Sequence, residues 1–230
     1  MQNLWNQKFN YKNISRVTDK NGARYYSCEG NKVPSVTTIL DKTKPQKDKD
    51  SLNSWKEKVG HAEAYKIAKA SMLRGDKMHK YLEDTLHGKQ MLDFEEDVNL
   101  EKKMSEVIVN NALAQNLNEI WGCEASLFYP DSHAGTTDLC GLYNNKESII
   151  DFKSSTKTKK KEWITDYFLQ TTAYALAHNF QYNTDISQGV ILICTPQLEF
   201  QEFIISDNEF LWYQNKFKQR LEQYKLLDRQ

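Results

Sequence analysis

The chain has 230 residues, of which 39% are hydrophobic and 27% charged, and this composition predicts a folded globular protein rather than a disordered one. Lysine plus arginine equals aspartate plus glutamate at 31 each, so the net charge gives no global argument for nucleic-acid binding. No apolar run approaches the roughly 20 residues of a membrane span, and the N-terminus has no hydrophobic signal core. We expect a cytoplasmic protein without a membrane partner; its asparagine- and lysine-rich composition is compatible with a bacterial or phage-infected cell.

The cysteines are scattered and form no C-x-x-C pair, at positions Cys28, Cys123, Cys140 and Cys194. This spacing argues against a zinc site and against a disulfide framework, and it fits a reducing compartment. We interpret the four residues as small core residues.

The first 50 residues predict a small β-rich arm. Short strands are expected over 14–18 and 24–28, on either side of a D-K-N-G turn. A P-S-V-T-T-I-L segment follows. Its proline suits the start of a helix or turn, and Ser35 or Thr37 is a candidate helix cap.

The next residues predict helices, because apolar side chains recur at helical spacing over 53–87, with Gly75 weakening the middle, and again over 95–118. The order then changes to three strands, a helix, two strands and a final helix, expected over 123–129, 136–143, 147–153, 163–179, 189–195, 200–205 and 210–227. This order predicts an α/β or α+β fold, in which helices flank a central mixed sheet.

The two strands around Asn144-Asn145 place three charged side chains together. A two-residue turn there sets Asp138 opposite Asp151 and puts Lys153 on the same face. Opposed carboxylates lie about 5 Å apart and repel, and a divalent cation offsets that repulsion. The pattern predicts a Mg²⁺ or Mn²⁺ site with a lysine beside it. An exposed, salt-bridged hairpin face is the alternative, and a four-residue loop would change the register.

The flanking residues make this pattern more specific. Asp151-Phe-Lys153 directly follows an apolar strand, and Asp138 follows Gly135-Thr-Thr. These two segments resemble the PD-(D/E)xK nucleases, with Thr137 where the motif has its proline, a departure common in RecB-type members. The resemblance implies a restriction-endonuclease-like core.

Two further segments resemble the RecB-like branch of that superfamily. Gly75-x-x-x-His79 lies ahead of the sheet, with Glu83 one helical turn later, and in that branch the histidine is a metal ligand. Gln170-x-x-x-Tyr174 follows the third strand, where the branch has a glutamine that supports its active site. Taken alone, both pairs are common on ordinary helices.

The P-S-V-T-T-I-L segment resembles one in the mitochondrial genome maintenance exonuclease family and its bacterial and phage relatives. The resemblance implies that Ser35 and Thr37 hold the DNA backbone, whereas a helix cap is the alternative from the residues themselves. Further candidate DNA contacts are a basic run after the third strand and two residues near the motifs, namely Lys157, Lys159, Lys160, Arg74 and Tyr174. Several aromatic residues, including Trp55 and Trp163, are candidates for base stacking, with core or rim positions as the alternative.

Together these resemblances imply a metal-dependent deoxyribonuclease that acts as a monomer on single-stranded DNA with free ends. The ion would be held by His79, Asp138, Asp151 and the Phe152 carbonyl, with Lys153 beside it and with Glu83 and Gln170 in support. They also imply an arm over 1–50 and a nuclease domain over 51–230, with a helical part (51–118) and a sheet core (119–230), in one compact unit. The clustered cysteine triplet of iron–sulfur relatives is missing, so no such cluster is expected.

Three other interpretations remain open at this point. The same core serves structure-specific and restriction-like endonucleases. Some relatives have lost catalysis and only bind nucleic acid, although an intact Asp–Asp–Lys set argues against that here. A coincidental match on an unrelated α/β domain is the third.

Overall fold

A computed structural model describes residues 1–20, 22–28, 30–89 and 99–228. Its centre is a five-stranded sheet in the order β4-β5-β6-β7-β8, in which only the β6–β7 pair is parallel. The strands are β4 (Leu117–Tyr129), β5 (His133–Tyr143), β6 (Lys146–Ser154), β7 (Gln188–Cys194) and β8 (Phe200–Ser206). This mixed sheet between helices confirms the expected fold class.

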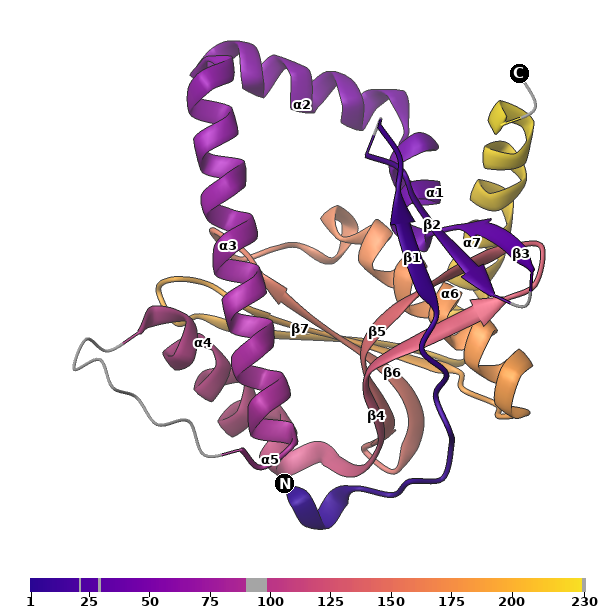
Figure 1. The fold of residues 1–230 in the computed structure, drawn as a ribbon. Coiled ribbons are helices and arrows are strands. Elements are labelled where there is room, and N and C mark those ends of the chain that lie inside the picture. Colours follow the sequence, from indigo (N-terminus) through magenta and orange to yellow (C-terminus); the bar gives the residue numbers. More distant parts are fainter. Residues whose placement is uncertain (21, 29, 90–98, 229–230) are drawn as a thin grey trace.

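Helices cover both faces of the sheet (Figure 1). Helix α6 (Thr165–Tyr182) makes the crossover from β6 to β7, and it packs on one face together with α7 (Asp207–Asp228). The other face is covered by the end of α3 (His61–Leu86) and by α4 (Leu100–Ile108). Each face therefore buries its own apolar cluster, and the sheet between them holds its strands in fixed register.

The N-terminal arm contains three strands rather than the two expected. Strands β1 (Ser15–Thr18), β2 (Arg24–Cys28) and β3 (Asn31–Pro34) form an antiparallel sheet. Helix α1 (Val36–Lys42) follows at once, and its N-cap is Ser35, as one of the two alternatives predicted. The arm packs on β5 through a small cluster of buried side chains: Tyr26, Val33, Phe128 and Ala134.

Two helices fill the region expected to be helical over 53–87. Helix α2 (Gln46–Val59) ends at Gly60, whose φ of 87° is the left-handed conformation that glycine tolerates, and α3 begins directly after it. Gly75 lies inside α3 without interrupting it. Helix α2 buries none of its residues and lies away from the sheet (Figure 1).

The expected helix over 95–118 is shorter and less regular than predicted. Asn99 caps α4 by accepting a hydrogen bond from the Glu101 N–H. A π-helical turn (Val109–Leu113) and a short α5 (Ala114–Asn116) follow, and Leu117 already belongs to β4. Residues 95–98 lie outside the described residues. Among the described helices, none combines the length and apolarity that crossing a membrane requires.

Candidate active site

The β5–β6 hairpin has the predicted register. Its turn consists of Asn144 and Asn145, with φ of 52° and 59°, and this left-handed pair matches the twist of the flanking strands. The recorded pairs end at Leu139↔Ile150, immediately before the two aspartates. The longer loop, which would have shifted the carboxylates, is therefore wrong.

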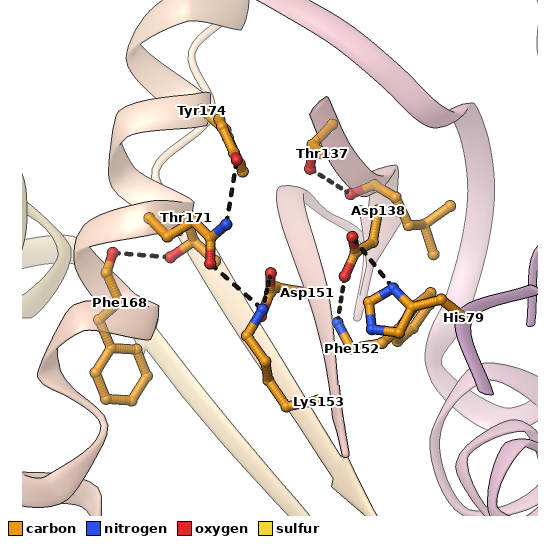
Figure 2. Close-up of polar contacts among 11 residues, drawn as sticks. His79, Thr137, Asp138, Asp151, Phe152, Lys153, Phe168, Thr171 and Tyr174 are labelled. Atoms are coloured by element: carbon orange, nitrogen blue, oxygen red, sulfur yellow. Dashed lines mark hydrogen bonds and ion pairs between the residues drawn. The ribbon is translucent and has the colours of Figure 1, made fainter. Parts of the chain in front are cut away.

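Asp138 and Asp151 occupy the next positions on the two strands. The Phe152 N–H donates to Asp138 Oδ2 at 2.7 Å, so the first carboxylate is fixed against the backbone of β6 (Figure 2). Because the N–H and C=O groups of one strand residue leave the same edge, the Phe152 carbonyl also points toward Asp138. The Asp138 carboxylate is thus held beside the residue whose carbonyl the motif assigns to the metal.

A third carboxylate, which the sequence analysis missed, continues this row. Glu124 on β4 lies opposite Asp138, because the pairs on either side are Cys123↔Leu139 and Ala125↔Thr137. Oxygen atoms of Glu124 and Asp138 and a ring nitrogen of His79 all lie within 4.8 Å of one another. The available signal was one charged residue within the strand expected over 123–129.

His79 reaches this row from α3. Its Nδ1 atom lies 3.5 Å from Asp138 Oδ1, and its ring meets the Phe152 ring edge-on (Figure 2). Burial lowers the pKa of His79, but the attraction of Asp138 outweighs burial and raises that pKa to about 9. Glu83, one turn further along α3, lines the same cleft while its carboxylate lies 3.0 Å from the Lys80 ammonium.

Lys153 pairs with the second aspartate. Its Nζ atom lies 2.7 and 2.6 Å from the two oxygens of Asp151, and it donates to Gln170 Oε1 at 3.3 Å. The Gln170 amide in turn donates to the Tyr174 hydroxyl at 3.1 Å. Helix α6 therefore holds the lysine through the glutamine, and the two predicted motifs form one hydrogen-bonded chain.

Gly135 explains how Tyr174 fits. A Cβ atom at Gly135 would lie 2.6 Å from the tyrosine ring, closer than real contacts allow. The ring therefore occupies the space that a side chain would fill. Glycine is therefore needed at position 135 so that Tyr174 can pack there and hold Lys153 through Gln170.

The pKa values of the three adjacent carboxyl groups show that negative charge exceeds positive charge at this site. Burial raises the pKa of Asp151 to about 6, with Lys153 opposing the rise and Asp138 adding to it. Burial also raises the pKa of Glu124 to about 7, with a further rise from Asp138. Burial would raise the pKa of Asp138 as well, but His79 and Lys153 hold it below its usual range. Three adjacent carboxylates compete here for two cationic side chains.

The residues fit a divalent cation. The buried Asp151 Oδ2 atom has no aligned hydrogen-bond donor and only the ion pair with Lys153. Carboxylate oxygens, a backbone carbonyl and one imidazole nitrogen form a donor set that suits Mg²⁺ or Mn²⁺. His79, Glu124 and Asp138 face a cleft of about 460 Å³, whose lining also includes Ser71, Gly75, Glu83, Lys153 and Ser154, whereas Asp151 is buried behind Lys153.

Two of the predicted DNA contacts do not face solvent. Ser35 is 3% exposed, and its hydroxyl accepts the Thr38 N–H at 3.0 Å as the cap of α1. Tyr174 is 4% exposed and supports Gln170 instead. Both hydroxyls are therefore engaged inside the protein, and the DNA contacts predicted for these two residues stay predictions. Thr37 is half-buried, with its hydroxyl 2.9 Å from that of Ser35.

The basic residues lie beside the cleft. Arg74 lies between Ser71 and Ser154 of the cleft lining and donates to the Ser154 hydroxyl at 2.8 Å. The loop after β6 is tied to β8, because Gln201 exchanges two hydrogen bonds with the Lys159 backbone. Lys157 and Lys160, in the same loop, are exposed.

The chain resembles named exonucleases over most of its length. It is 28% identical over 218 residues to mitochondrial genome maintenance exonuclease 1 of Xenopus tropicalis and 27% identical over 203 residues to the human protein of that name. These matches cover 88% and 84% of this chain, and 60% and 58% of the relatives. The chain thus spans about three fifths of the relatives' length, and the expected resemblance to a nuclease is confirmed.

Other comparisons add little. No family model matches the chain. The crystal structure of a protein named "putative exonuclease" from Eubacterium rectale superposes with a TM-score of 0.41 at 14% identity, covering 66% of this chain and 64% of that one. A likeness of that size carries no argument.

Proposed function

We propose that the chain is a metal-dependent deoxyribonuclease that removes nucleotides from the free ends of single-stranded DNA. One observation carries the proposal. Glu124, Asp138 and Asp151 occupy neighbouring positions on three adjacent strands, with His79 on one side and Lys153 on the other. The names of the relatives support nuclease chemistry at such a centre.

His79, Glu124, Asp138, Asp151 and the Phe152 carbonyl are the groups that would hold Mg²⁺ or Mn²⁺. Such an ion, when bound, would lower the pKa of a water molecule and neutralise charge on the scissile phosphate. Lys153 orients the attacking water or stabilises charge that develops on the phosphoryl oxygens. Gln170 and Tyr174 keep the lysine in place, and Glu83, which lines the same cleft, would support the cation.

We infer single-stranded DNA with free ends from the resemblance to end-dependent exonucleases. Helix α2 and the beginning of α3 lie away from the sheet (Figure 1), and in this proposal they restrict access to the site to one strand. Thr37, Arg74 and the three lysines at 157, 159 and 160 are the proposed phosphate contacts. We propose that the protein acts as a monomer.

The test is digestion of an end-labelled single strand, linear or circular, with Mg²⁺, Mn²⁺ or EDTA. We expect metal-dependent shortening of the linear strand and no cutting of the circle. Lys153→Ala should abolish the shortening, whereas Lys146→Ala, on the same strand but at the surface, should not. Cutting of the circle would indicate an endonuclease on the same core. No cleavage by folded protein with either metal would leave a nucleic-acid-binding relative.

A further inference from the structure

One flank of α7 lies against the segment that leads into α6. Glu209 Oε1 lies 2.7 Å from the Lys161 ammonium, and Arg220 Nη1 lies 3.3 Å from Asp166 Oδ1. The short η3 helix (Lys161–Trp163) and the start of α6 therefore run alongside α7 between these two contacts. We call this surface the α6–α7 seam.

Two tryptophans lie along the seam with their rings in solvent. Trp163 is 58% exposed and Trp212 is 53% exposed, although an indole usually contributes to a core. Trp212 shares its flank with Glu209 and Lys216, because the three positions are spaced by three and four residues. Large aromatic rings exposed on two elements that adjoin through ion pairs suit a binding surface.

A lysine ammonium group lies over each of the two tryptophan rings. Lys160 Nζ lies 5.4 Å from the centre of the Trp163 ring, and Lys216 Nζ lies 4.5 Å from that of Trp212. The acidic Glu209 is neutralised by its ion pair with Lys161, which leaves Glu162 as the opposing charge within η3. The seam thus combines stacking platforms with net positive charge.

The seam also continues from the candidate active site. Lys153 Nζ lies 5.2 Å from the centre of the Tyr167 ring, and Tyr167 follows Trp163 by four residues, in the first turn of α6. The exposed Lys157 and Lys160 lie in the loop between β6 and Trp163. Basic and aromatic side chains therefore occur in the segment that leads from Lys153 to Trp163.

We propose that the α6–α7 seam binds the part of a single-stranded DNA that extends beyond the active site, with bases stacked on Trp163 and Trp212 and phosphates near the lysines. Stacking requires an open base face, which a duplex does not offer along its length. The inference rests on the proposed function, because a nuclease centre supplies the strand that the seam would receive.

The experiment measures fluorescence anisotropy of labelled oligothymidylates of about 6 and 20 nucleotides, in EDTA so that no strand is cut. We expect Trp163→Ala and Trp212→Ala each to weaken binding of the longer strand about tenfold, with a smaller loss for the shorter strand. Trp163→Phe and Trp212→Phe should restore most of the affinity. Phe180→Ala is the matched control, because Phe180 is 57% exposed at the other end of α6.

Equal affinity of wild type and both alanine variants for the longer strand would overturn the proposal, as would an equal loss for both lengths. The outcome of this binding experiment can be distinguished from the outcome of the nuclease test. Cleavage without dependence of binding on the tryptophans would reject the seam and keep the enzyme. Tryptophan-dependent binding without cleavage would keep the seam and reject the enzyme.

Discussion

The Nδ1 atom of His79 lies 3.5 Å from the Oδ1 atom of Asp138, and this contact joins α3 to the middle of three adjacent strands. The other oxygen of Asp138 accepts the Phe152 N–H. The Asp138 carboxylate thus connects the helix to the sheet, and Glu124 and Asp151 lie on either side of it. The geometry of the proposed metal centre therefore depends on the packing of α3 against β6.

Glu124→Gln should weaken cation binding while leaving the fold intact. The substitution keeps the size of the side chain but removes one negative charge from the row, so we expect Mn²⁺ affinity to fall at least about tenfold. Isothermal titration of the metal-free protein measures this directly. Glu119→Gln on the same strand is the control, and equal affinities of the two variants would remove Glu124 from the site.

Gly135→Ala should disturb Lys153 through Tyr174. The new Cβ would displace the tyrosine ring, and overpacking of this kind costs about 1–3 kcal/mol of unfolding free energy. In a Tyr174→Leu background the same substitution should cost much less, because the ring that it meets is absent. A double-mutant cycle on urea unfolding checks the coupling. Additive costs would show that the two positions are independent.

Gly75→Ala should separate stability from activity. A Cβ at Gly75 meets nothing within 4 Å and the residue lies inside α3, so alanine is expected to stabilise the helix by up to about 1 kcal/mol. Gly75 also lines the cleft, where a strand would approach the backbone closely. We expect higher thermal stability together with slower cleavage. Unchanged cleavage would indicate that nothing approaches this glycine.

Acid should destabilise the protein through a buried histidine far from the proposed metal. Burial lowers the pKa of His133 to about 4, while its ring bonds to the Ala173 carbonyl and the Ser132 hydroxyl. Below pH 6.5 the unfolded chain binds the proton and the folded chain does not, so stability falls as the pH drops toward 4. Between pH 7 and 5 this one group should cost about 2 kcal/mol.

The measurement is urea unfolding at both pH values in EDTA, for wild type and His133→Gln. The variant should show a smaller difference between the two pH values, although it is less stable at pH 7. An identical difference in both proteins would assign the acid sensitivity to other groups, such as the buried His178, whose pKa burial also lowers to about 4.

The sequence predicted the hairpin and its acidic pair because two asparagines accept left-handed backbone angles with little strain, which fixed the turn at two residues. It did not predict Glu124, because the β4–β5 connection has no such marker. The structure closes that connection with Tyr129↔His133, and only this pairing sets Glu124 opposite Asp138. The sequence thus predicted the two aspartates, whose hairpin turn has a length set by local residues, but not the glutamate on β4.

Local sequence was also insufficient to predict where the first long helix ends and the next begins. Both Gly60 and Gly75 are plausible helix ends by residue type, but only Gly60 has the positive φ of a break. Tertiary packing decided between them: Met78 and Leu82 of α3 are buried against the sheet, whereas α2 buries nothing. The burial of the Ser35 and Tyr174 side chains likewise depends on neighbours that are distant in sequence. The motifs therefore identified both residues without predicting that their hydroxyl groups are buried.

The most direct test of the metal-dependent nuclease is the cleavage rate of Asp138→Asn beside Asp131→Asn, on a linear single strand with saturating Mn²⁺. Asp131 is an exposed loop residue with a left-handed backbone that asparagine also tolerates. We predict that Asp131→Asn cleaves like wild type. Asp138→Asn should be slower by at least about a hundredfold, because it removes charge from the centre that stabilises the transition state. Cleavage by Asp138→Asn at the wild-type rate would contradict the account.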